Sequence, residues 1–306
     1  MSASVTGRAA RGPSRLQMRE WLDGYLYAAP FILGFLFWIA YPMGYSIWLV
    51  LHDWDLLTPQ RFVGLRNLER MIDDPSVPLA LANTAFFALV GVPLHLAFAF
   101  LLAMALNVPL RGRSAFRTAF YLPAITPLVA SAVLWSRIFH PEFGILNEFI
   151  GLFGVPAQKW LFQPELAKPA LILMGFWSVG PQMVIFLAGL QNVSPTLLEA
   201  ASIDGAGPLQ RFRHITLAVM SPVILFNLIV GVIGSFQIFA VVLIMTDGGP
   251  QNATLMAVLY IYRNAFQFFK MGYAAALAWL LFLIIVAFTA LQFWISRRWV
   301  YYEEAR

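Results

Sequence analysis

Six long stretches of the chain contain no Asp, Glu, Lys or Arg, and this feature limits the possible folds more than any other. Each stretch can hold a helix of about 20 residues, enough to cross the ~30 Å of hydrocarbon in a bilayer. Because a helix satisfies its own backbone hydrogen bonds in lipid, six spanning helices are the simplest arrangement. A composition of 60% hydrophobic and 11% charged residues agrees with a membrane protein. The stretches are 24–51, 75–110, 118–136, 169–198, 215–246 and 271–296.

The Lys and Arg residues indicate which segments face the cytoplasm, where they are normally in excess. If the N-terminus is inside, the predicted inner segments hold 12 Lys and Arg in 60 residues, and the outer segments hold 8 in 79. Both termini are therefore expected in the cytoplasm, and the net charge of +5 reflects topology rather than nucleic-acid binding. The predicted parts are a cytoplasmic tail 1–23, a six-span domain 24–296 and a cytoplasmic tail 297–306.

Segment 194–217 is a polar interruption between the fourth and fifth predicted spans. Ser194 and Pro195 predict a helix start, because serine caps free amides and proline suits the first turn. This helix is expected to run to Asp204, and one of the glycines at 205 and 207 to end it in the left-handed conformation. Pro208 then opens a second helix that enters the fifth span. These residues alone leave two interpretations open, a solvated loop or a docking surface for another protein.

This segment resembles the EAA loop of ABC importer permeases in residue types and spacing over about 20 positions. The matching residues are Glu199-Ala200-Ala201, Asp204-Gly205-Ala206, Phe212 and Ile215-Thr216-Leu217. The family often has proline where this chain has Ala218, which affects only a local kink. The resemblance implies an all-α type I ABC importer permease fold with a cytoplasmic coupling helix that docks into an ATPase. In the complex that the resemblance implies, Glu199 makes the polar contact to the ATPase, and Asp204 orders the glycine turn. The implied docking residues are Glu199, Ala200, Ala201, Asp204, Gly205 and Ala206.

A second stretch, from Thr246 to Gly272, is similar to the sugar branch of the same family. It contains Gly248, Gly249 and Pro250, which alone would indicate an ordinary turn. In the sugar branch this pattern forms the external loop between the last two spans of the first permease subunit. The resemblance therefore implies transport of a sugar or polyol.

The chain lacks the residues that most catalytic and metal sites require. It has no cysteine, which excludes disulfides and thiol catalysis. None of its three lysines follows a glycine, so it has no Walker A motif, and its four histidines show no metal-binding spacing. We expect no enzyme activity, no metal and no cofactor in this chain, with ATP and Mg bound by a separate ATPase. His95, inside the second span, is interpreted as a hydrogen-bonded packing residue.

Two spans carry residues suited to a solute path. A stripe of mostly small and polar residues on one helical face of the fifth span indicates either helix packing or a solute path. Its members are Asn227, Gly231, Gly234, Ser235 and Ile238. Gly180 and Pro181 can interrupt the fourth span, as in many transport sites. Matching to the maltose-type subunit implies the following path residues: Trp177, Ser178, Val179, Gln182, Gly231, Ser235 and Ile238. Ile238 lacks the amide of the family position, so the site is expected to be weaker or rearranged.

The sequence is identified as a permease subunit of an ATP-driven importer in a bacterial or archaeal inner membrane. The resemblance implies a second, related permease, two copies of an ATPase, and an external binding protein that delivers solute to loops 52–74 and 247–270. Three alternatives stay open: the same architecture for a non-sugar solute, an ion-coupled secondary carrier, and a membrane scaffold or enzyme without transport. The second is disfavoured because no predicted span contains an Asp, Glu, Lys or Arg.

Overall fold

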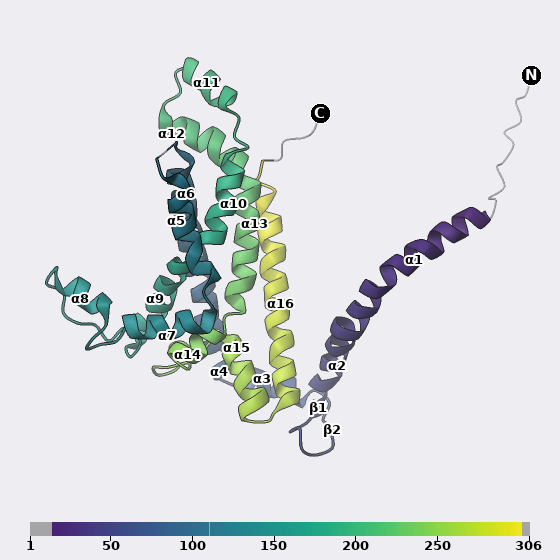
Figure 1. The fold of residues 1–306 in the computed structure, drawn as a ribbon. Coiled ribbons are helices and arrows are strands. Elements are labelled where there is room, and N and C mark those ends of the chain that lie inside the picture. The colour runs from purple at the N-terminus through teal and green to yellow at the C-terminus, as the bar shows by residue number, and fades with distance from the viewer. Residues whose placement is uncertain (1–13, 110, 302–306) are drawn as a thin grey trace, which may run out of the picture.

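The computed structural model describes residues 14–109 and 111–301, which form an elongated bundle of helices (Figure 1). Within the described residues, four single helical runs are long and apolar enough to cross a membrane, namely residues 15–50, 76–107, 208–236 and 271–296. Two pairs of helices, each bent at a short break, raise the number of candidate spans to six when each pair counts as one span. The predicted all-helical six-span fold is thereby confirmed.

The first span stands apart from the rest of the bundle (Figure 1). It consists of α1 (Arg15–Phe35), the π-helical turn η1 (Leu36–Ala40) and α2 (Tyr41–Val50). A capping box between Ser14 and Gln17 starts the helix at residue 15, earlier than the predicted span start at residue 24. No residue of α1 or η1 is buried, whereas α2 packs against the last helix. Residues 1–13 of the predicted tail lie outside the described part.

A short β-hairpin and a helix join the first two spans. Strands β1 (His52–Asp53) and β2 (Arg61–Phe62) pair antiparallel, and α3 (Arg66–Asp73) follows. The Asp74 carboxylate then accepts hydrogen bonds from the hydroxyls of Tyr260 and Tyr273 and from the Ser76 backbone N–H, the last two at 2.6 and 2.9 Å. Burial opposes ionisation of Asp74, but these hydrogen bonds outweigh it and hold the pKa of Asp74 below its ordinary value.

The second span forms the centre of the bundle. It contains α4 (Ser76–Phe86), η2 (Phe87–Gly91) and α5 (Val92–Asn107). Ala99 and Ala103 on α5 are completely buried, because small side chains let α10 and α13 approach closely. The span thereby supplies one wall for the elements that follow it.

The third and fourth spans are both broken. The third, α6 (Arg113–Tyr121), η3 (Leu122–Ile125) and α7 (Leu128–Ile138), bends by 100°. The bend follows from Pro127, since the residue before a proline is forced out of the helical region and Thr126 has ψ 131°. The third span is thus no straight helix, unlike the simple prediction for 118–136. After α8 (Ile145–Gly151), the fourth span comprises α9 (Pro164–Gly175), η4 (Phe176–Ser178) and α10 (Gly180–Leu190) and bends by 54°, as Gly180-Pro181 predicted.

The fifth span is shorter than predicted. Residues 195–236 form α11 (Pro195–Ile203), α12 (Pro208–Arg211), η5 (Phe212–Thr216) and α13 (Leu217–Phe236). The chain then breaks, and Ile238 lies beyond the helix whose face it was predicted to share. The packing of α14 against α7 redirects the chain there. The remaining elements are α14 (Ala240–Met245), α15 (Ala257–Tyr262), η6 (Arg263–Gln267) and α16 (Met271–Ser296).

Candidate functional site

A cavity of about 660 Å³ lies between α5, the break in the fourth span and the end of α13. The fourth span bends by 54° at this break, and residues on both sides of the bend line the cavity. Residues at the end of α13 line it as well. Six of the seven predicted path residues line this cavity, namely Ser178, Val179, Gln182, Gly231, Ser235 and Ile238. Trp177 lines an adjoining cavity of about 410 Å³, which Ser178 and Ile238 also line. The structure thus brings the predicted residues together, although the fifth-span residues do not share one helix.

The lining of the main cavity is mostly apolar, with a few uncharged polar side chains. Within the described residues, no charged side chain lines it. The Oε1 atom of Gln182 is enclosed and has no hydrogen-bond partner in this part of the chain, and the Ser178 hydroxyl donates to the Gly175 carbonyl at 3.2 Å. Amide and hydroxyl side chains of this kind can exchange hydrogen bonds with solute hydroxyls, and the Gln182 oxygen could do so once its amide turns toward the cavity.

Gly234 of the predicted stripe also lines the cavity, whereas two of its polar residues, His95 and Gln237, were not predicted there. Gln237 could have been found as one of only two amides in the stretch 215–246. The other is Asn227, which does not line the cavity, because its amide donates to the Val223 carbonyl of its own helix at 2.9 Å. His95 makes the expected hydrogen bond, to the Ile172 carbonyl at 2.8 Å, and it also lines the cavity.

Helix α11 projects at the end of the bundle far from α3 and α15 (Figure 1). Gly205 has φ 84°, the predicted left-handed conformation, and the Ala206 N–H closes the turn on the Ala201 carbonyl at 2.9 Å. The prediction that Ser194 caps the helix is wrong, because its hydroxyl pairs with that of Thr196 at 2.6 Å.

The side chains of this segment are largely uncovered. Glu199 and Asp204 are exposed, and neither carboxylate has a hydrogen bond or ion pair within residues 14–109 and 111–301. The expected ordering of the glycine turn by Asp204 is therefore absent from the described contacts. Ile203 is 87% exposed, an unusual position for a large apolar side chain unless another surface covers it.

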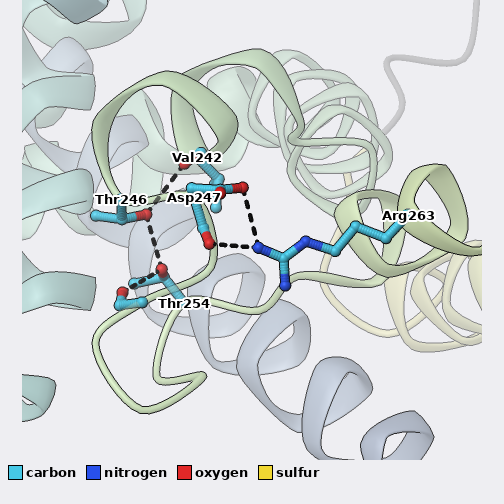
Figure 2. A network of polar contacts seen from close by, with 6 residues as sticks. Val242, Thr246, Asp247, Thr254 and Arg263 are labelled. Atoms are coloured by element: carbon cyan, nitrogen blue, oxygen red, sulfur yellow. Dashed lines mark hydrogen bonds and ion pairs between the residues drawn. The ribbon is translucent and has the colours of Figure 1, made fainter. Parts of the chain in front are cut away.

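The loop after α14 is held by its own polar contacts (Figure 2). Gly248 has φ 76°, which favours glycine. The buried Thr254 hydroxyl donates to the Gly249 carbonyl at 2.6 Å and lies 2.7 Å from the Thr246 hydroxyl. Arg263 donates to the backbone carbonyl and the carboxylate of Asp247, at 2.7 and 3.0 Å. The contact of Asp247 with Arg263 thus ties the Gly248-Gly249-Pro250 loop to η6.

Thr254→Val is expected to destabilise the folded protein by about 1–2 kcal/mol, because it leaves the Gly249 carbonyl without a partner in a buried loop. A lower midpoint of thermal unfolding of the purified complex would show this. Thr196→Val, at an exposed site on α11, is the control and should change the midpoint little. An equal midpoint for Thr254→Val and wild type would mean that this hydroxyl does not hold the loop.

The helical bundle and the uncharged cavity between its broken spans define a membrane-embedded transport component. Residues 71–301 match the family described as the binding-protein-dependent transport system inner membrane component, and the chain belongs to this family. It is a transport subunit and not an enzyme, and it is a component of the inner membrane. The predicted family, ABC transporter permeases, is confirmed.

Known relatives agree along nearly the whole chain. The probable ABC transporter permease protein YesP of Bacillus subtilis (strain 168) is 40% identical, with 97% of each chain covered. The lactose transport system permease protein LacF of Rhizobium radiobacter is 36% identical, covering 93% of this chain and 98% of LacF. In a crystal structure of a bacterial ABC transporter involved in import of the acidic polysaccharide alginate, one chain matches with a TM-score of 0.79 and 25% identity. That match covers 93% of this chain and 99% of the other.

Proposed function

We propose that this chain is the permease subunit through which a neutral sugar or polyol crosses the membrane. The uncharged cavity at the break of the fourth span carries this proposal, because its amide and hydroxyl groups suit solute hydroxyls. A phosphate or an acidic sugar would favour a cationic side chain, and no Lys or Arg of the described residues lines the cavity. The lactose permease LacF, which transports a neutral disaccharide, supports the same class of solute.

The exposed surfaces support the predicted partners. α1 and η1 carry many exposed aromatic and aliphatic side chains, which lipid and a second permease subunit would cover. α11 would dock into an ATPase, so that a pair of permeases would bind two ATPase copies, and ATP and Mg would be held there. The loop from Gly248 to Pro250 and the β1–β2 hairpin would receive the external binding protein.

The mechanism that fits this arrangement is alternating access. α11 follows α10 directly and leads through α12 into α13, so movement of α11 is transmitted along the chain to both walls of the cavity. Closure of the ATPase pair on ATP would displace α11 and open the cavity toward the delivered solute. ATP hydrolysis would then reopen the cavity toward the cytoplasm.

The test is to purify the tagged chain from its native membranes and identify the proteins that accompany it. Uptake of radiolabelled lactose, maltose and an alginate oligosaccharide would then be measured in proteoliposomes with ATP inside and binding protein outside. We expect a second permease, an ATPase and a binding protein, and ATP-dependent uptake of a neutral sugar. Uptake of the acidic oligosaccharide alone would overturn the neutral class. Uptake driven by a proton gradient without ATP would contradict the ATP-driven importer and support the ion-coupled carrier instead.

The proposed orientation places segment 107–117 and α11 in the cytoplasm and loop 52–74 outside. Because the chain has no cysteine, single cysteines report their own side of the membrane. Thr58→Cys is expected to react with a membrane-impermeant thiol reagent in intact cells. Asn107→Cys, also at an exposed position, should react only after permeabilisation. The opposite labelling pattern would invert the proposed topology.

A further inference from the structure

His95 is fixed at the break in the fourth span by a hydrogen bond from α5. Its Nε2 atom lies 2.8 Å from the Ile172 carbonyl oxygen on α9. A carbonyl only accepts, so Nε2 carries the hydrogen in this contact. In the neutral imidazole, Nδ1 is then an acceptor with no hydrogen of its own.

The end of α9 explains why this carbonyl is free. In an uninterrupted α-helix, the N–H of Phe176 would bond to the Ile172 carbonyl four residues earlier. Here the helix tightens into η4, and the Phe176 N–H points to the Leu173 carbonyl instead. The His95 ring replaces the lost backbone donor, so the break and the histidine stabilise each other.

The ring is held by close packing as well. A Cβ atom at Gly175 would overlap the Cε1 and Nε2 atoms of His95, so glycine is required for this approach. The Phe176 ring meets the imidazole edge to face, with 4.8 Å between centroids. The imidazole therefore has one orientation, set by three neighbouring residues of the fourth span.

Nδ1 is the part of the ring without a protein partner. Within the described residues Nδ1 makes no hydrogen bond, and unlike the Gln182 amide oxygen it is not enclosed by other atoms. His95 lines the main cavity together with Gln182, whose Oε1 atom is also an unpaired acceptor. Of these two acceptors, Nδ1 of His95 is the accessible one, whereas the Gln182 amide oxygen is enclosed in this structure.

We propose that His95 contacts the transported solute, its Nδ1 atom accepting a hydrogen bond from a solute hydroxyl while Nε2 holds the break in the fourth span. This inference rests on the proposed function and adds a specificity-determining residue on the second span. A solute with a hydroxyl donor would satisfy the Nδ1 acceptor, whereas a solute without donors would leave it unpaired.

The first test asks whether position 95 faces the solute path, and it needs no knowledge of the solute. His95→Cys, Ala99→Cys and Leu94→Cys would be compared in the assembled transporter, using a charged, water-soluble methanethiosulfonate reagent. Ala99 is buried one turn further along α5, and Leu94 is exposed on a side away from the main cavity. Because a thiol reacts as its thiolate in water, we expect position 95 to react at least about 10-fold faster than both controls. Equal rates at 95 and 99 would overturn the proposal.

The second test separates the two ring nitrogens. His95→Gln keeps an N–H that can reach the Ile172 carbonyl but has no acceptor at the position of Nδ1, because its amide oxygen sits on the same terminal carbon as that nitrogen. His95→Leu removes both the donor and the acceptor. For His95→Gln we expect an unchanged unfolding midpoint with lactose uptake about 3- to 10-fold lower, the effect of one hydrogen bond. For His95→Leu we expect a lower midpoint as well. Wild-type uptake in His95→Gln would mean that His95 only packs, and this would overturn the proposal.

The failure of the proposed function would look different. If the wild-type transporter moved no neutral sugar, the function would fail, whereas the labelling rates would still report whether position 95 faces the path.

Discussion

Gly272→Ala is expected to prevent stable folding of the chain in the membrane. Gly272 begins α16 where the helix crosses the end of the first span, and a Cβ atom there would overlap the carbonyl oxygen of His52. It would also lie 2.9 Å from the Leu49 carbonyl oxygen and from the Asn67 amide nitrogen. Two of these three atoms belong to the backbone, so the neighbours cannot turn aside as a flexible side chain would. The cost is about 3 kcal/mol or more, at the upper end for overpacked sites.

The measurement is the yield of monodisperse transporter after solubilisation, with its midpoint of thermal unfolding. Gly234→Ala is the matched control, because an added Cβ there has no atom within 4 Å. It should fold like wild type, and alanine is also the better helix former. Equal yields and midpoints for the two variants would show that α16 does not approach the first span so closely.

The sequence predicts the spans well because bilayer thickness and the cost of charge in lipid act on composition alone. The same holds for local backbone signals. Gly205 has the left-handed conformation, and the fourth span breaks at Gly180, since both depend on residues only a few positions away. These parts of the fold and of the docking segment needed no knowledge of distant contacts.

Other features depend on residues far apart in the sequence. Pro127 explains locally why the third span bends, but the position of α7 after the bend, packed on α14, depends on distant residues. Asp74 ended a loop in the sequence, yet it binds two tyrosines almost 200 residues away. Periodicity placed Ile238 on the helical face of the fifth span, and tertiary packing overrode the helix there. His95 was predicted to be a packing residue because the sequence does not show that α5 lines the cavity, where the Nδ1 atom is accessible.

Glu199→Ala is expected to uncouple the permease from its ATPase without affecting the fold of the chain. Glu199 is exposed on α11 and forms no ion pair within the described residues, so its loss costs this chain little stability. In the proposed complex it would be buried against the ATPase as a charged contact. Truncating one partner of such a pair costs about 2–5 kcal/mol, which corresponds to association at least about 30-fold weaker.

The measurement is recovery of the ATPase with the tagged permease, together with ATP-dependent uptake of lactose and the unfolding midpoint of the permease. Glu148→Ala on α8, an exposed glutamate distant from α11 in Figure 1, should leave all three unchanged. The diagnostic result is a loss of ATPase recovery and uptake at an unchanged midpoint, because a folding defect would lower all three. If Glu199→Ala retains both the ATPase and uptake, the contact must come from other residues of α11. The exposed apolar side chains of Leu197 and Ile203 would then be the next to replace, since a docking surface without a charged anchor must rely on apolar burial.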